Sequence, residues 1–415
     1  MNKLLLRPRL LIYIQLVVLL AACKSPDVSS EASVATAYKL EIADSVQVDI
    51  LAAYPKILDV HKTTGEILLA QSSPPHVWIL STEGKVLKEW SKSGDGPDEI
   101  GANLLSAEFF EDKIALMGYM TVKLFDRDFN LIDIYKAGYP SSGMIYVGYN
   151  HLFEFESNGE SQLVSYMGGP QTEIPSIQKE YYKAFNIVDV LSPNRHTTNV
   201  RQPAARLESE GSKTKDNTST DFYEPVGELQ PHSRYLNDRA YYLMKPEFDV
   251  RDNQLFYALT DDTTLNVLEL PSGNPLRHYS IPFDEFILFE GYSLGKEGYA
   301  EQDIPRDWEG KITKLLHVDD KEVIFYTSGI KLTTLEQFRD DPDFRAQTRR
   351  INHTKYLIVK DGKRLNTELK LDKKYETPFM ADDQGYIWTA QNINELEEEP
   401  DLLTFYKLRI VPGEE

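Results

Sequence analysis

Residues 122–134, VKLFDRDFNLIDI, have the form of a strand, a polar turn and a second strand. Apolar and polar residues alternate on either side of the turn, as is typical of β-strands with one buried face. The same form recurs at residues 77–87, 265–279 and 356–365, where Asp, Gly or Asn again occupies the turn. These residue types tolerate the positive φ angles of tight hairpins. The recurring pattern predicts an all-β fold.

The spacing of the turns indicates a repeat. Gly84 and Asn130 are 46 residues apart, and Asn130 and Asn274 are 144 apart, or three steps of 48. Gly273 and Gly362 are 89 apart, or two steps of about 45. A period of roughly 40–50 residues with about four strands per unit is typical of β-propellers. We expect six blades, with seven still open. The alternatives are a β-sandwich and two stacked β domains.

Three segments depart from the repeat. Residues 192–233 contain few apolar residues and mix both charges, so we expect an excursion loop there. Residues 333–351 predict a small helical insert, in which Thr333 and Glu336 have the spacing of a capping box. Residues 402–408 form a last apolar strand. We expect it to complete a blade begun near the N-terminus, because such closure leaves no exposed sheet edge.

The first 22 residues are predicted to be an export signal. A basic start precedes a 13-residue apolar core, which is too short to span a bilayer of roughly 20 helical residues. The core ends in LAAC at residues 20–23, which resembles the bacterial lipobox and makes Cys23 the expected lipidation site; an ordinary secretory signal is the alternative. Residues 23–37 are small and polar, as in a flexible tether. The predicted propeller then occupies residues 38–411, with membrane contact through the N-terminal lipid only.

Composition limits the possible functions. The chain has 415 residues, 41% of them hydrophobic, and its net charge is −20. Removing residues 1–22 takes away three positive charges, so the exported chain would carry about −23. Such a charge argues against nucleic-acid binding through phosphate contacts. The single Cys excludes an internal disulfide and a cysteine-based zinc cluster.

One loop connects the chain to a known family. The segment 94–100, GDGPDEI, combines Gly94, Gly96, Pro97 and Glu99 in a tight turn, with Gly96 expected at positive φ. It resembles the G-x-G-P-G-E loop of six-bladed β-propeller lipoproteins of Bacteroidetes, which are related to NHL and TolB-like propellers. Asp98 and Ile100 depart from that family's glycine and aromatic residue. The resemblance implies a six-bladed ring at the outer membrane, periplasmic or surface-exposed, and for most members no established activity.

No motif for chemistry stands out. The eight His residues lack close metal-binding spacing, no Gly-x-Ser-x-Gly elbow is present, and we predict neither catalytic residues nor a metal site. Paired carboxylates can bind Ca²⁺, so this ion remains open as a cofactor. They are equally typical of turns, and they occur at residues 261–262, 319–320, 382–383 and 397–399. Of the four Trp residues, Trp78 and Trp388 fall in strand patterns and Trp308 in a loop, so Trp308 is the predicted ligand contact.

These observations predict an envelope-anchored, non-catalytic binding module for a protein, peptide or glycan. The rival hypothesis is a Ca²⁺-dependent hydrolase or lactonase-like propeller enzyme. That enzyme would need inward-facing Asp, Glu, Asn or His residues near one end of the ring axis. The net charge of the chain favours cationic or neutral ligands.

Overall fold

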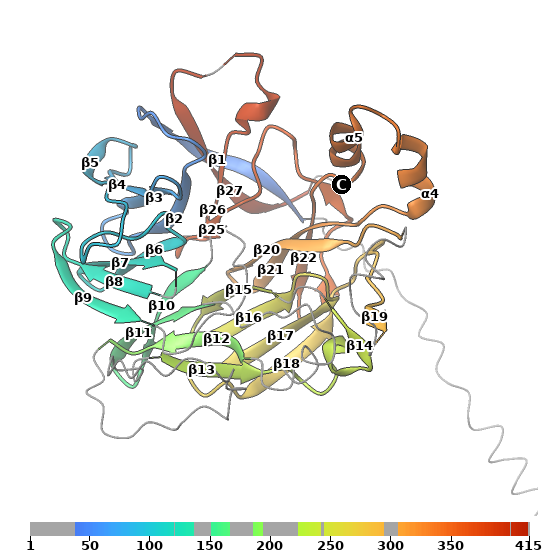
Figure 1. Cartoon of the computed structure of the whole chain (residues 1–415), viewed down its shortest axis with the longest axis horizontal. Helices are drawn as coiled ribbons and strands as arrows, with labels where there is room; N and C mark the ends of the chain where they lie inside the picture. Colours follow the sequence, from blue (N-terminus) through green and yellow to red (C-terminus); the bar gives the residue numbers. More distant parts are fainter. Residues whose placement is uncertain are drawn as a thin grey trace, which may run out of the picture.

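The computed structural model describes residues 38–119, 121–136, 151–166, 186–193, 223–241, 245–293, 306–398 and 400–413. Within these ranges six small sheets follow one another around a common centre (Figure 1). The fold is therefore a six-bladed β-propeller, as the repeat predicted. The signal segment, Cys23, the tether and the centre of the predicted excursion loop lie outside the described residues.

Each blade is an antiparallel sheet, and the first five are built from strands that follow one another in the sequence. The first three blades contain β2 (Lys56–Val60), β3 (Ile67–Gln71), β4 (His76–Leu80) and β5 (Val86–Trp90); β6 (Ser106–Phe110), β7 (Lys113–Gly118), β8 (Thr121–Phe125) and β9 (Leu131–Lys136); and β10 (Leu152–Ser157), β11 (Glu160–Ser165), β12 (Asn186–Leu191) and β13 (Tyr223–Glu228). The fourth and fifth contain β15 (Pro246–Arg251), β16 (Gln254–Leu259), β17 (Thr264–Glu269) and β18 (Pro275–Ser280); and β20 (Lys311–Val318), β21 (Lys321–Thr327), β22 (Lys355–Lys360), β23 (Lys363–Arg364) and β24 (Leu369–Lys370).

The sixth blade closes the ring with both ends of the propeller. It contains β25 (Met380–Ala381), β26 (Ile387–Ala390), β27 (Leu403–Pro412) and, as its outermost strand, β1 (Tyr38–Val48). β1 pairs with β27 over its whole length, from Tyr38 opposite Pro412 to Val48 opposite Leu403. This confirms that the last strand completes a blade begun near the N-terminus. The pairing covers an edge that each strand would otherwise expose.

The innermost strands of the blades are β2, β6, β10, β15, β20 and β25, which contact one another in that order around the axis (Figure 1). Strand direction alternates across the four positions of each blade, and the chain passes from the outermost strand of one blade to the innermost strand of the next. The six innermost strands therefore run in the same direction. We call the face where they begin the entry face and the opposite one the exit face. Where the structure describes them, the connections between blades and those between the second and third strands of a blade lie on the entry face.

The additional elements also lie in entry-face connections. A 3-10 turn, η1 (Arg234–Leu236), and the small sheet of β14 (Arg239–Ala240) and β19 (Tyr292–Ser293) flank the fourth blade. The predicted insert between β21 and β22 contains α4 (Leu332–Leu335), η2 (Glu336–Phe338) and α5 (Phe344–Ile351), and η3 (Ile393–Glu395) follows β26. The capping box expected in the insert is wrong. α4 starts after Lys331 without a side-chain cap, and Asp307 instead accepts a hydrogen bond from the Leu332 N–H at 2.7 Å.

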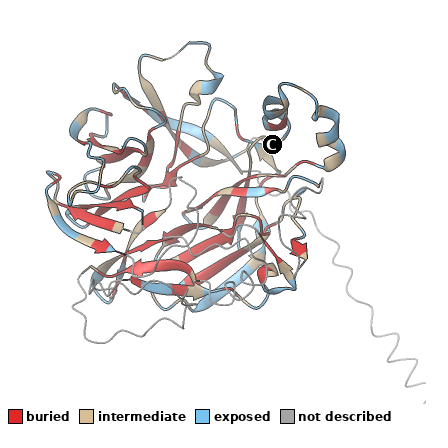
Figure 2. Cartoon of the chain, viewed as in Figure 1, coloured by how far each residue is buried: buried red, intermediate tan, exposed pale blue. Residues whose placement is uncertain are grey.

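Burial follows the radial position of a strand. Every residue of β3 and β6 is buried, whereas most of β18 is exposed, and Figure 2 shows this gradient from the centre outward. Apolar side chains of neighbouring blades form the core between them. Trp78 and Trp388 belong to the cluster between the sixth and first blades, as their strand patterns predicted. This packing fixes the inner strands that carry the polar side chains at the axis.

Candidate functional site

Three polar side chains from different blades form a hydrogen-bonded chain at the entry end of the axis. His151 Nε2 lies 3.0 Å from Glu247 Oε2, and Lys314 Nζ lies 3.2 Å from His151 Nδ1. An ammonium group can only donate, so Nδ1 accepts and Nε2 carries the ring proton that is donated to Glu247. Lys245 Nζ lies 2.9 Å from the other oxygen of Glu247. The four residues therefore form one connected network.

Burial and neighbouring charges set the protonation states of this network. Burial, together with the charge of Lys314, lowers the pKa of His151 to about 4. Burial likewise lowers the pKa of Lys314 to about 8, against the opposing charge of Glu247. Burial alone would raise the pKa of Glu247, but Lys245, His151 and Lys314 bring it down to about 2. At neutral pH the network holds two cations, one anion and a neutral imidazole.

A third lysine faces this network from across the ring. Lys56 begins β2, which lies opposite β15 in the order of the inner strands, and its charge acts on Lys245 and Glu247. Burial lowers the pKa of Lys56 and raises that of the neighbouring Glu376. We call Lys56, Lys245 and Lys314 the entry lysines. Three ammonium groups thus gather beside two carboxyl groups in a chain of net charge −20.

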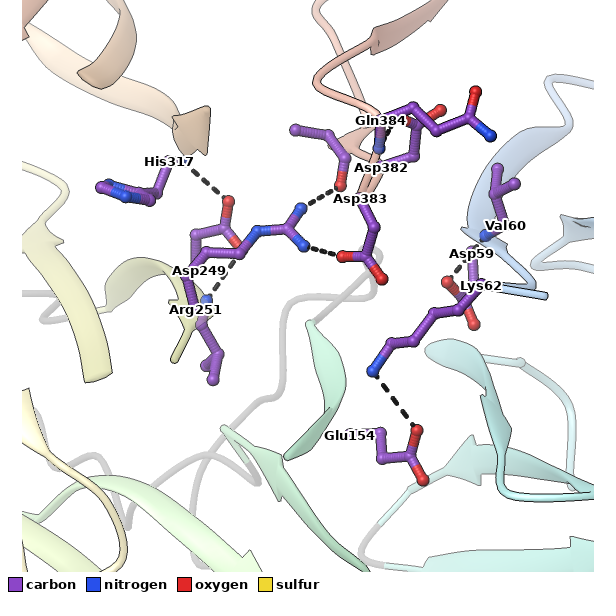
Figure 3. Close-up of polar contacts among 12 residues, drawn as sticks. Asp59, Val60, Lys62, Glu154, Asp249, Arg251, His317, Asp382, Asp383 and Gln384 are labelled. Carbon is purple, nitrogen blue, oxygen red and sulfur yellow. Dashed lines mark hydrogen bonds and ion pairs between the residues drawn. The ribbon is translucent and has the colours of Figure 1, made fainter. Parts of the chain in front are cut away.

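Further along the axis, carboxylates join neighbouring blades. Asp59 on β2 accepts the Phe109 N–H of β6 at 2.8 Å. Asp249 on β15 accepts the His317 N–H of β20 at 2.8 Å (Figure 3). Glu108 on β6 accepts the Glu154 N–H of β10 at 3.0 Å. Burial raises the pKa of Asp59 to about 7 despite these donors. A hydrogen bond from a backbone N–H to a carboxylate on the neighbouring strand therefore links three pairs of adjacent inner strands.

At the exit end, ion pairs cross between more distant blades. Figure 3 shows Arg251 of β15 directed at Asp383 beyond β25, and Lys62 beyond β2 directed at Glu154 of β10. Arg251 also donates to the Ala381 carbonyl at 2.6 Å. The inward-facing Asp, Glu and His residues that an enzyme would need are present at the axis. Most of their carboxylates already accept backbone N–H groups or pair with cations.

The aspartate pairs of the sequence are separate turn residues. Asp382 accepts hydrogen bonds from the Gln384 and Tyr386 N–H groups and from the Trp388 indole N–H at 2.8 Å. The Tyr235 hydroxyl donates to Asp261, whereas Asp320 pairs with lysines on the surface. Within the described ranges, no three His, Cys, Asp or Glu side chains are arranged to hold a metal ion. The structure therefore does not bring these pairs together at one site.

The loop that carries the family resemblance surrounds a lysine. Gly94 and Gly101 close its base by exchanging backbone hydrogen bonds, and Glu99 accepts the Gly96 N–H at 2.6 Å. The buried Lys123 of β8 donates to the carbonyls of Gly96 at 3.1 Å, Pro97 at 2.9 Å and Glu99. Gly94 and Gly101 have positive φ angles of +140° and +86°, whereas Gly96 does not, so the expectation for Gly96 is wrong.

Several connections of the entry face carry a large exposed apolar side chain. The structure places Trp308 there, 40% exposed, with its backbone paired to Ile330. Five more lie in entry-face connections: Leu51, Tyr54, Tyr119, Leu236 and Ile351. The other large apolar residues found exposed among the described residues are on outermost strands of blades: Ile42, Leu87, Ile132 and Leu276.

A pocket opens beside this face, between the sixth blade and the first. Its volume is about 70 Å³, and among its described lining residues the charged ones are Lys56 and Glu376. We call it the seam pocket; its walls are mainly apolar and include Ala52, Tyr54, Phe379, Ile393, Leu403 and Phe405. Tyr54 is 61% exposed and has a φ of +52°, which is strained for a residue with a side chain. Lys56 thus belongs to both the pocket and the entry lysines.

Sequence reasoning singled out Trp308 but missed the axial network and the seam pocket. His151 and Lys314 are 163 residues apart, and neither lies in a recognisable motif. The one sequence signal that could have indicated the axial network was a charged residue inside an apolar strand pattern, as at Glu247 and Lys314. Cys23 lies outside the described residues.

Comparison with known proteins identifies a shared fold. No protein-family model matches the chain, and no curated protein matches it significantly. A DUF4221 family member from Bacteroides vulgatus superposes with a TM-score of 0.57 at 11% identity, covering 91% of this chain and 100% of that one. A protein from Bacteroides fragilis described as exported gives 0.51 at 10% identity, covering 90% and 95%.

An aldose sugar dehydrogenase from Streptomyces coelicolor gives a lower TM-score of 0.47 at 10% identity, covering 91% and 99%, and supports no inference. In the described residues no helix is long and apolar enough to cross a membrane. At these identities the likenesses establish a common fold with two Bacteroides proteins and carry no activity over to this chain.

Proposed function

We propose that this protein is an extracytoplasmic, lipid-anchored binding module that engages a polypeptide segment of an envelope protein on its entry face. The observation that carries the proposal is the exposure of large apolar side chains, Leu51, Tyr54 and Trp308 among them, in connections of the same face. Fully burying one such side chain contributes roughly 1.5–3 kcal/mol. Aromatic residues of this kind dominate the energetics of protein interfaces.

The direction of β1 supports this arrangement. β1 is the outermost strand of its blade and runs from the exit face at Tyr38 to the entry face at Val48. A lipid on Cys23 would therefore be attached, through residues 24–37, to the exit side of the propeller. An attachment on the exit side would leave the entry face accessible to a partner.

The export signal, the lipobox and the two Bacteroides structures of similar fold support an extracytoplasmic setting. The loop around Lys123 supports kinship with the NHL and TolB-like lipoprotein propellers. It keeps four of the family's positions, and the contacts of its carbonyls with Lys123 give that loop a structural role.

The entry lysines favour a ligand that carries an anionic group. The net charge of the chain favours a cationic or neutral ligand, whereas three lysines beside two carboxyl groups favour an anionic group at the entry end. The same lysines argue against the rival Ca²⁺-dependent hydrolase, because nearby ammonium groups repel a divalent cation. Asp59 and Asp249 are further occupied as hydrogen-bond acceptors for neighbouring strands.

The test compares entry-face variants with an equally exposed control. Tyr54→Ser and Trp308→Ser should each weaken the capture of envelope proteins in a crosslinking pull-down from intact cells. Leu276→Ser, on an outermost strand and 47% exposed, should leave capture unchanged. Equal capture by all variants contradicts the proposal. So does Ca²⁺-dependent turnover of lactone, phosphoester or glycoside substrates that an axial carboxylate variant abolishes.

A further inference from the structure

We infer that the seam pocket and the entry lysines together bind the C-terminal residue of the partner polypeptide, with its apolar side chain in the pocket and its α-carboxylate toward the lysines. This inference rests on the proposed function and deepens it by naming the part of the partner that is recognised. It follows from the place of Lys56, which lines the pocket and interacts electrostatically with Lys245 and Glu247 of the axial network.

The pocket has the size and lining for one apolar side chain. About 70 Å³ corresponds to roughly five water-sized groups, which suits a branched or small aromatic side chain but not a long acyl chain. Phe379, Leu403 and Phe405 contribute rings and branched carbons to the walls. An apolar ligand group would replace water that gains few hydrogen bonds there.

The charges beside the pocket select a carboxylate. Lys56 Nζ lies 5.6 Å from the centre of the Phe379 ring, so the cation is held at the edge of the apolar wall. Lys245 and Glu247 pair with each other and offset one another, so the positive charge facing the pocket comes from Lys56 and from Lys314 across the axis. Glu376, whose pKa burial raises, opposes them with a single carboxylate. The balance of charge therefore favours an anion.

A chain end is favoured over an internal segment because only the last residue carries both its side chain and a free carboxylate on the same Cα. The residues that precede it would meet Leu51, which is 97% exposed, and Tyr54 at the rim of the pocket. Capture of a terminal carboxylate is an established mode of peptide recognition. The exposed rim and the charged interior thus match the two parts of such a ligand.

Fluorescence anisotropy with labelled octapeptides tests the inference. A peptide ending in Leu with a free carboxylate should bind at least tenfold more tightly than its C-terminal amide and than a peptide ending in Gly. Lys56→Met keeps the aliphatic stem over Phe379 and should remove most of the preference for the free acid. Ala52→Phe should fill the pocket and remove the preference for Leu. Lys62→Met, at the exit end of the same blade, should retain both preferences.

Equal binding of acid and amide overturns the inference, as does an unaltered preference in Lys56→Met. Displacement of the peptide by dodecanoate at lower concentration than by the free peptide acid would assign the site to a lipid instead. Thermal melts of each variant establish that it is folded. If the pull-down still depends on Tyr54 and Trp308 while the peptides do not bind, this inference fails and the proposed function stands.

Discussion

Replacing Lys123 by Met tests whether the loop 94–99 is structural. The ammonium group of Lys123 is the common partner of three loop carbonyls, and its side chain is buried at 8% exposure. Met keeps most of the apolar stem and removes only the donor. The variant should therefore fold as a propeller but lose the attachment of this loop to β8.

The expected loss of stability follows from these contacts. A hydrogen bond to a charged group contributes about 1.5–3 kcal/mol, so three give a gross loss of roughly 4–9 kcal/mol. Removing the ammonium also relieves a desolvation penalty of several kcal/mol, and water can reach the half-exposed carbonyls. We expect a net loss of about 2–4 kcal/mol. With an unfolding entropy of about 2.1 cal/mol/K per residue over about 375 residues, Tm should fall by roughly 3–5 °C.

Differential scanning calorimetry and urea unfolding measure this loss. Lys88→Met is the matched control, because Lys88 is 41% exposed and bonds to the Arg127 carbonyl and to Asp128 on the surface. It should change the free energy of unfolding by less than about 1 kcal/mol. If Lys123→Met melts no lower than this control, the lysine does not hold the loop. Unchanged stability with lost partner binding would make the loop functional.

Three further predictions concern the anchor, the axis and the ring closure. Cys23→Ser should release the protein from membranes and abolish incorporation of labelled fatty acid; undiminished labelling contradicts lipidation. Burial raises the pKa of Asp59 to about 7, so the folded state retains a proton that the unfolded chain has lost, and stability falls as the pH rises from about 4 to about 7. Urea unfolding should therefore show the stability difference moving in favour of Asp59→Asn by ~1–3 kcal/mol between pH 5 and pH 8, whereas a constant difference refutes the shift. Gly84→Ala should lower Tm more than Gly159→Ala, because a Cβ at Gly84 would lie 2.3 Å from the Gln47 carbonyl oxygen, whereas at Gly159 nothing lies within 4 Å.

The repeat was readable in the sequence because hairpins are local. Alternating apolar residues and the turn glycines specify strand, turn and strand within about 15 residues, and Gly84, Gly273 and Gly362 indeed have positive φ. The period between hairpins then indicated the propeller. The position of the last strand was predictable as well, since a ring must close its edges.

The sequence did not reveal which turn residue has a positive φ angle where side-chain hydrogen bonds fix the backbone conformation. In the hairpin of residues 122–134 the residue at positive φ is Phe129 rather than Asn130, because the Asp126 carboxylate accepts the N–H groups of Asp128 and Asn130 and fixes the turn. In the glycine loop the carboxylate of Glu99 plays a similar part. In both turns the residue types alone are compatible with more than one backbone conformation, and only the side-chain contacts show which one forms.

The sequence by itself thus indicated the β-propeller, a number of six or seven blades, and the closure of the ring by the last strand. It also predicted an export signal. Only the tertiary structure decided what lies at the axis and at the seam. Each blade contributes one inner strand to the ring, so His151, Glu247 and Lys314 meet although 96 and 163 residues separate His151 from the other two. The seam pocket likewise exists only where the sixth blade meets the first. Hairpin formation depends on neighbours in the chain, whereas a charge network at the axis depends on ring closure, which no local pattern encodes.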